Sequence, residues 1–217
     1  MSAFNICKMF LLFELMWLFS LSTVSFGDSF NQSKYAEAQK FYKNRNYQKV
    51  ISILQQEIKE NSSDVMYYEL MGHSYFQLNS KLQAKEYYDR AISLGSKDVI
   101  VFLNQASLSG DLETQKYWLY KATEIEPLHA AANATLFTIL QANAIDALNK
   151  GEKDAALMSI YEAKEIIYRY MRMALGNPNY EDPKMQTILL LFSNRLKDLD
   201  KLENSVTKSP DTYLNPN

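Results

Sequence analysis

The two histidines are the first side chains to consider for chemistry, because the 217-residue sequence contains no others. His73 follows a glycine inside an otherwise amphipathic stretch, "YYELMGHSYF", and lies one helical turn after Glu69, so the two could pair. A metal site, however, needs several converging ligands, and neither histidine has the H-E-x-x-H or H-x-x-E-H spacing. We therefore predict no metal site, with His73 partly exposed and His129 capping a helix start or exposed.

Other chemistries also lack their sequence signals. The single cysteine, Cys7, lies in the N-terminal segment, and no serine has the G-x-S-x-G context of a nucleophile elbow. With only six glycines, no phosphate-binding loop of the Walker or Rossmann type is present. Three triplets, at Asn31, Asn61 and Asn133, match the N-glycosylation sequon, which matters only in a eukaryotic host. We predict a protein that is not an enzyme and takes no cofactor.

Charge argues against nucleic acid as a partner. The formal net charge is -2, and lysine and arginine are spread along the chain instead of forming a basic stripe. The chain has fifteen tyrosines, which could stack on bases, but without a basic surround we interpret most of them as packing residues.

The first 27 residues have the pattern of a secretory signal peptide, with a short basic start, the apolar run "MFLLFELMWLFSL" and small residues before Asp28. Glu14 interrupts the apolar run, and a charge is costly in a membrane. An uncleaved signal anchor over residues 9–25 and a buried helix are the alternatives, although the run is short for a span of about 20 residues. We predict an exported, periplasmic or envelope-associated protein that touches a membrane only if residues 9–25 are retained.

Any site must be positioned by helices, because apolar residues recur at three- and four-residue steps and no strand pattern persists. Asp64, Asp98 and Asp154 are expected at helix starts. The short polar connections imply antiparallel neighbours. The predicted helices are about 33–44, 47–60, 65–78, 81–94, 98–108, 111–125, 129–149, 152–175 and 183–203.

A 34-residue period organises these helices. From Tyr68 onward the sequence resembles a tetratricopeptide repeat (TPR) in every motif slot but the last, where Ser96 replaces proline. The other slots are filled by Tyr68-x2-Met71-Gly72-x2-Tyr75 and Ala84-x3-Tyr88-x2-Ala91. Weaker copies are marked by Ala38-x2-Phe41, by "GDLETQKYWLYKATEIEP" and by Ala144, Gly151, Ala156, Ile160 and Ala163.

The resemblance implies an all-α fold, a right-handed superhelix of antiparallel helical hairpins (a TPR solenoid) with a C-terminal capping helix. Gly72 is interpreted as a position where two helices approach closely, with Tyr75 packed beside it. The expected segments are a signal peptide at 1–27, repeat units at 31–64, 65–95, 96–129 and 130–175, a capping helix at 183–203 and a disordered tail at 204–217.

The expected capping helix carries an apolar stripe of Ile188, Phe192, Leu196 and Leu199. Its "ILLLF" run is apolar on more than one side. It is therefore expected either to be covered by the long fourth hairpin or to form the seam of a homo-oligomer.

In tetratricopeptide proteins the first helix of each hairpin lines a concave groove that binds a partner peptide or helix. The resemblance therefore implies a groove formed by Tyr35, Gln39, Tyr42, Glu69, His73, Phe76, Ile100, Asn104 and Ser107. Tyr35 and Gln39 stand where chaperone-binding members have a lysine and an asparagine for a terminal carboxylate, so a cochaperone is not expected. We predict an exported scaffold or adaptor for a protein partner. The alternatives are a membrane-anchored assembly factor, a homo-oligomer and an enzyme using His73.

Overall fold

The computed structural model describes residues 34–59 and 64–208. The expectations for the signal segment, for the sequons at Asn31 and Asn61 and for the tail beyond residue 208 lie outside these residues. Residues 34–43 are helical, and eight further helices follow. They are α2 (Tyr47–Lys59), α3 (Val65–Gln77), α4 (Lys81–Ser93), α5 (Val99–Leu108), α6 (Leu112–Ile125), α7 (Ala130–Asn149), α8 (Lys153–Leu175) and α9 (Pro183–Thr207).

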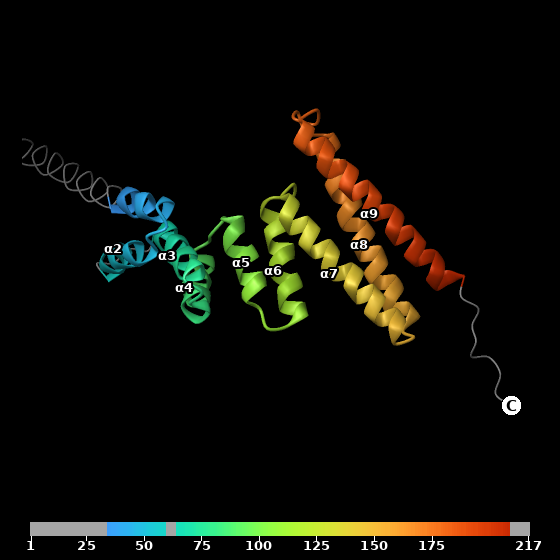
Figure 1. The fold of residues 1–217 in the computed structure, drawn as a ribbon, viewed down its shortest axis with the longest axis horizontal. Helices are drawn as coiled ribbons and strands as arrows, with labels where there is room; N and C mark the ends of the chain where they lie inside the picture. The colour runs from blue at the N-terminus through green and yellow to red at the C-terminus, as the bar shows by residue number, and fades with distance from the viewer. Residues whose placement is uncertain (1–33, 60–63, 209–217) are drawn as a thin grey trace, which may run out of the picture. The chain divides into compact units, whose positions relative to one another are not determined.

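Within each unit, neighbouring helices pack as antiparallel hairpins, as Figure 1 shows for α3 with α4, α5 with α6 and α7 with α8. No strand occurs in the described residues. The predicted all-α class with hairpin packing is confirmed. Contacts divide the chain into two compact units, which we call unit 1 (through Ser96) and unit 2 (from Lys97 onward) and describe separately.

Local capping explains where several helices begin. The Asp64 side chain accepts a hydrogen bond from the Met66 N–H at the start of α3, and Asp98 does the same for Ile100 at the start of α5. Both were predicted as helix-start residues. Asp154 also lies at a helix start, in the first turn of α8, where Glu152 is the N-cap residue. There the negative charge of Asp154 faces the positive end of the helix dipole.

Unit 1 has a core in which rings carry much of the volume. Tyr67 and Met71 of α3 are buried with Val50 and Leu54 of α2 and with Ala38 of helix 34–43. Tyrosine and phenylalanine side chains from helix 34–43, α3 and α4 pack around this cluster, half-buried, and α2 adds Ile51 and Ile58. Fully burying one large apolar side chain contributes roughly 1.5–3 kcal/mol, so these rings stabilise the short hairpins of unit 1.

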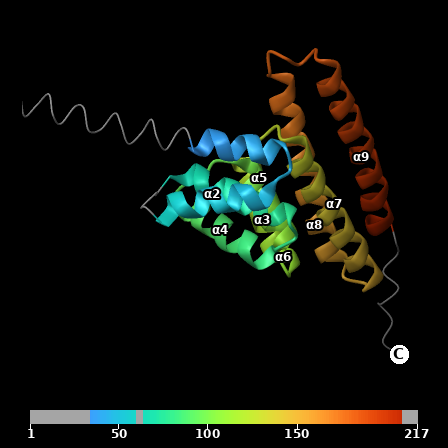
Figure 2. The same cartoon turned by 60° about the vertical axis from the view of Figure 1, so that its left-hand side comes forward.

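Unit 2 contains the short helices α5 and α6 and three longer helices, α7, α8 and α9, which run along one another (Figure 1 and Figure 2). Its core is mostly aliphatic, with Leu136, Leu140, Ile160 and Ile167 fully buried on α7 and α8. Small residues at the contact positions, such as the buried Ala163, let the helix backbones approach closely.

The C-terminal helix differs from the expectation in two ways. α9 runs to Thr207, so residues 204–207, predicted as tail, are helical, because the apolar stripe continues to the buried Val206. Its "ILLLF" run is covered on one side only: Phe192 is buried, whereas Leu190 and Leu191 are 63% and 57% exposed. α9 packs mainly against α8.

Candidate functional site

Gly72 is a packing position. A Cβ atom placed there would lie 2.5 Å from both Cδ1 and Cε1 of Tyr88, whose ring is fully buried on α4. Only glycine fits at such a distance. The predicted close approach is therefore present, but the expected neighbour was wrong. Tyr75 instead stacks on Tyr87, with ring centroids 5.3 Å apart and planes 15° from parallel.

His73 is tied to the same buried ring. Its Nδ1 lies 2.9 Å from the hydroxyl oxygen of Tyr88, and the two rings meet edge to face. The imidazole is half-buried and also contacts the ring of Tyr42, at 6.5 Å between centroids. His73 was expected to be partly exposed and to line the groove, and the structure adds that one edge of its ring contacts the interior of the hairpin through Tyr88.

Glu69 has a different partner from the one considered above. Its Oε1 accepts a 2.6 Å hydrogen bond from the hydroxyl of Ser96, which is buried. Ser96 occupies the slot where the repeat motif has proline. Its hydroxyl, which proline lacks, joins the end of the hairpin to α3 through the hydrogen bond to Glu69. The structure thus pairs Glu69 with Ser96 and His73 with Tyr88.

The groove residues expected in unit 1 are only partly brought together. Tyr42 contacts His73, and it also meets the ring of Tyr47 at 5.3 Å. Gln39 is exposed and Phe76 is half-buried. Tyr35 leans toward the core, with its ring 5.5 Å from that of the buried Tyr67. The rings of Tyr42 and His73 therefore bring one predicted groove residue of helix 34–43 against one of α3.

The groove residues expected in unit 2 share one face of α5, because they recur at three- and four-residue steps. Ile100 is 45% exposed, Ser107 is exposed and Asn104 is half-buried. The Ser107 hydroxyl donates to the carbonyl oxygen of Asn104 at 2.8 Å. This face offers one apolar and two polar side chains.

His129 caps the start of α7, which is one of the two roles predicted for it. Its Nδ1 accepts a 3.2 Å hydrogen bond from the Ala132 N–H. The sequon at Asn133 is unusable in the folded chain, because this side chain is fully buried and donates to the carbonyl oxygens of Pro127 and His129.

The described part of the chain shows neither a metal-binding cluster nor a membrane-spanning helix. None of its His, Cys, Asp and Glu side chains gather in groups of three or more that could hold a metal ion. None of its helices is both long enough and apolar enough to cross a lipid bilayer.

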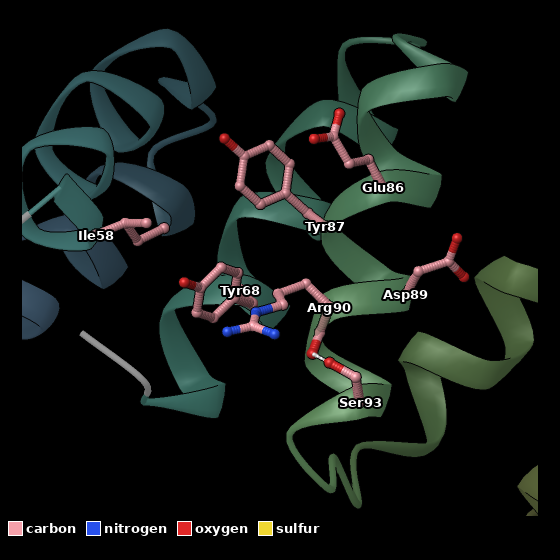
Figure 3. Close-up of a pocket in the computed structure, with 7 residues that line it drawn as sticks. All are labelled: Ile58, Tyr68, Glu86, Tyr87, Asp89, Arg90 and Ser93. Atoms are coloured by element: carbon pink, nitrogen blue, oxygen red, sulfur yellow. Dashed lines mark hydrogen bonds between the residues drawn. The ribbon is translucent and has the colours of Figure 1, made fainter. Parts of the chain in front are cut away.

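A hollow of about 560 Å³ lies elsewhere on unit 1, where sequence reasoning expected only packing (Figure 3). Ile58 of α2, Tyr68 of α3 and Tyr87 of α4 form its apolar walls, and the guanidinium of Arg90 lies 5.7 Å from the ring centroid of Tyr68. Burial raises the pKa of the Tyr87 hydroxyl, so it stays protonated and can donate at neutral pH. No sequence motif marks this site, because its residues come from three helices and have no common spacing.

Comparisons with known proteins found no matching family model and no matching curated protein. Among solved structures, the chain is similar to YrrB, a TPR protein with an unusual peptide-binding site, at 16% identity over 81% of this chain and 91% of that one, with a TM-score of 0.47. It is similar to MamA at 14% identity over 77% and 96%, with a TM-score of 0.46. It is also similar to TTC0263, a thermophilic TPR protein of Thermus thermophilus, at 15% over 81% and 98%, with a TM-score of 0.38.

These likenesses are loose. What defines the chain is its own packing: antiparallel hairpins, the glycine contact between α3 and α4, and small residues at the helix crossings. The chain is an all-α protein of antiparallel helical hairpins, and its sequence resembles the tetratricopeptide repeat.

Proposed function

We propose that this protein is a non-enzymatic scaffold that binds another protein, with helix 34–43 and α3 of unit 1 providing the binding face. The observation that carries the proposal is the contact between Tyr42 and His73, which places two half-buried rings from successive first helices next to each other. Gln39 lies three residues before Tyr42 and Phe76 lies three residues after His73, so each continues the same helix face about one turn away.

This surface has the chemistry of a peptide-binding face. Aromatic rings supply large contact area while losing few rotatable bonds, and they are enriched among the residues that dominate binding energy. The exposed amide of Gln39 adds hydrogen-bonding groups that can read a backbone. An extended or helical segment of a partner protein fits this combination best.

The binding face is tested by a pull-down from extracts of the source cells with the double variant Tyr42→Ala, Phe76→Ala. We expect it to lose the partner that wild type retains, because it removes both anchors. Leu82→Ala is the matched control, since Leu82 is 84% exposed on α4 and outside the proposed face. Equal recovery by the double variant and wild type would show that the face is wrongly assigned.

We also propose that the scaffold acts outside the cytoplasm, in the periplasm or at the cell envelope. The support is the signal-peptide pattern of residues 1–27. The alternative is an assembly factor held at the membrane by residues 9–25. The mass of the mature chain separates the two: a chain beginning at Asp28 is expected, and an intact N-terminus would favour the anchored form.

The exposed Leu190 and Leu191 favour a second, smaller proposal, a homo-oligomer formed through α9. Light scattering at rising protein concentration tests it. We expect association in the wild type that is lost in Leu190→Glu, Leu191→Glu, and a wild type that stays monomeric at high concentration would end the proposal.

A further inference from the structure

A second binding site, on a different side of α3 from the proposed face, is the furthest inference that the structure supports. We propose that the hollow lined by Ile58, Tyr68, Tyr87 and Arg90 binds a carboxylate carried by an extended peptide, with Arg90 pairing the carboxylate. Successive residues of a helix are turned by about 100°, so Tyr68 projects about 140° away from His73. The site is therefore separate from the face formed by Tyr42 and His73.

The walls of the hollow are held in place before any ligand arrives. Tyr87 is stacked on Tyr75, and the Tyr75 hydroxyl accepts a 3.3 Å hydrogen bond from the Gln55 side-chain amide of α2. Tyr68 lies against Tyr87, with ring centroids 6.4 Å apart. These contacts hold α2, α3 and α4 in place around the hollow. Because the hollow is already ordered, ligand binding costs less conformational entropy.

Arg90 supplies the charge. Its guanidinium lies against the ring of Tyr68 rather than against a carboxylate of the described residues. A guanidinium placed on an aromatic ring keeps N–H groups at its edge available, and these match the two oxygens of a carboxylate. In Figure 3 the carboxylates of Glu86 and Asp89 point away from the guanidinium of Arg90.

The surroundings select the class of ligand. The rings of Tyr68 and Tyr87 and the side chain of Ile58 offer an apolar wall for the methylene groups of a peptide side chain. The carboxylates of Glu86 and Asp89 also line the hollow, and they repel a multiply charged anion such as a phosphate more strongly than a singly charged carboxylate. At about 560 Å³ the hollow falls within the roughly 300–1,000 Å³ typical of ligand sites. A single carboxylate beside an aliphatic group can contact the apolar wall, meets less repulsion than a multiply charged anion and fits the volume of the hollow.

The test uses the full chain and three mixtures of fluorescently labelled seven-residue peptides with leucine beside the central position. The first has a central glutamate and an amidated end. The second has a central glutamine and an amidated end. The third has a central glutamine and a free terminal carboxylate. Affinity is measured by fluorescence anisotropy, and comparison of the first and third mixtures identifies whether a side chain or a chain end supplies the carboxylate.

We expect wild type to bind at least one carboxylate mixture about tenfold to a hundredfold more tightly than the neutral mixture, as for a hydrogen-bonded charge pair. Arg90→Gln should erase this preference, and Arg90→Lys should retain part of it. Lys85→Gln is the matched control, because Lys85 is exposed on the same helix but does not line the hollow. Equal binding of all three mixtures by wild type, or an unchanged preference in Arg90→Gln, would overturn the proposal.

The double variant Tyr42→Ala, Phe76→Ala separates this inference from the proposed function. It should bind the carboxylate mixtures as tightly as wild type does, even if it loses the partner in the pull-down. If instead it loses the carboxylate preference, the peptides occupy the other face and the hollow is not their site.

Discussion

Units 1 and 2 differ in the side chains that fill the space between their helices. In unit 1 the helices α2, α3 and α4 have 13 residues each, and aromatic rings fill the space between them. In unit 2 the helices α7, α8 and α9 have 20, 23 and 25 residues, and their core is dominated by leucine, isoleucine and alanine. A short helix has few core positions, so each must bury more surface, and one aromatic side chain buries roughly 150–250 Å².

Polar contacts between helices occur in both units. In unit 1 they include the contact between Tyr88 and His73 and the hydrogen bond from Ser96 to Glu69. In unit 2 they include pairs of opposite charge: Lys164 of α8 pairs with Asp200, at 2.6 Å, and with Glu203 of α9. Two long helices lie side by side over more turns than two short ones. They therefore have positions at the edge of the apolar contact where such ion pairs can form.

The largest loss of stability is expected from removing an aromatic ring from the core of unit 2. Phe192 of α9 is buried, and its ring centroid lies 4.6 Å from that of Tyr170 on α8. Phe192→Ala should cost about 3–5 kcal/mol of unfolding free energy, because it leaves a cavity in the contact. Hydrogen exchange of α8 and α9 peptides, with thermal unfolding, measures the loss.

Leu175→Ala is the control for Phe192→Ala, since Leu175 is 57% exposed on α8 and outside the proposed contact of α9, and it should change stability by less than about 0.5 kcal/mol. If both variants behaved alike, α9 would not be anchored by its buried stripe, and the contrast between the two units would lose its basis.

An intermediate effect is expected in unit 1 from adding one methyl group. Gly72→Ala should destabilise the hairpin of α3 and α4 by about 1–3 kcal/mol, because the new Cβ would overlap the buried ring of Tyr88. This sign is opposite to the gain of about 1 kcal/mol that alanine normally brings to a helix. Denaturant unfolding measures it.

Two further variants locate the cause of the Gly72→Ala effect. Adding Tyr88→Leu to Gly72→Ala should cost less than the two single changes summed, because the clash is gone. Ala106, the buried residue 34 positions after Gly72, already carries the methyl group, so Ala106→Gly should destabilise unit 2. A stabilised Gly72→Ala would refute the contact with Tyr88.

The smallest effect concerns the charge cluster of unit 2. The hydrogen bond from Lys164 lowers the pKa of Glu203 in the folded chain, and a bond from Tyr161 adds to this. A lowered folded-state pKa stabilises the fold at pH values above the ordinary value of about 4.5, and the contribution is lost as the pH falls through the lowered value.

Lys164→Met should therefore cost below about 1 kcal/mol at neutral pH, since the partners are partly exposed. The difference from wild type should shrink in acid below about pH 4.5. Lys201→Met, which breaks an exposed pair with Asp198, is the control and should have no measurable effect. A difference that stayed constant with pH would mean that Lys164 acts through packing alone.

The sequence was sufficient for the helical hairpins and for the close approach at Gly72, because both follow from periodicity and residue size. It was not sufficient for the partners of those residues. Nothing in the spacing indicates that Tyr88, and not Tyr75, faces Gly72, since both are aromatic and both occupy motif slots. The hydrogen bond from Ser96 to Glu69 joins residues 27 positions apart, and such contacts depend on three-dimensional placement.

The hollow at Arg90 was missed for the same physical reason. Tyr68 fills the tryptophan slot of the repeat motif, so the sequence indicated a packing residue, and its ring does lie beside Tyr87. What the motif does not specify is how far a neighbouring helix stands from that ring. Ile58 is contributed by α2, and the hollow exists only because α2, α3 and α4 meet there.

The ring of Tyr88 has a consequence for engineering the binding specificity of unit 1. One side of it determines which residue is allowed at position 72, and its hydroxyl engages His73, which belongs to the proposed binding face. Recognition and folding therefore share a side chain. A library that varies His73 alone would leave the Tyr88 hydroxyl without this partner in many members. Varying residues 72, 73 and 88 together is the way to change what the face binds while keeping the hairpin intact.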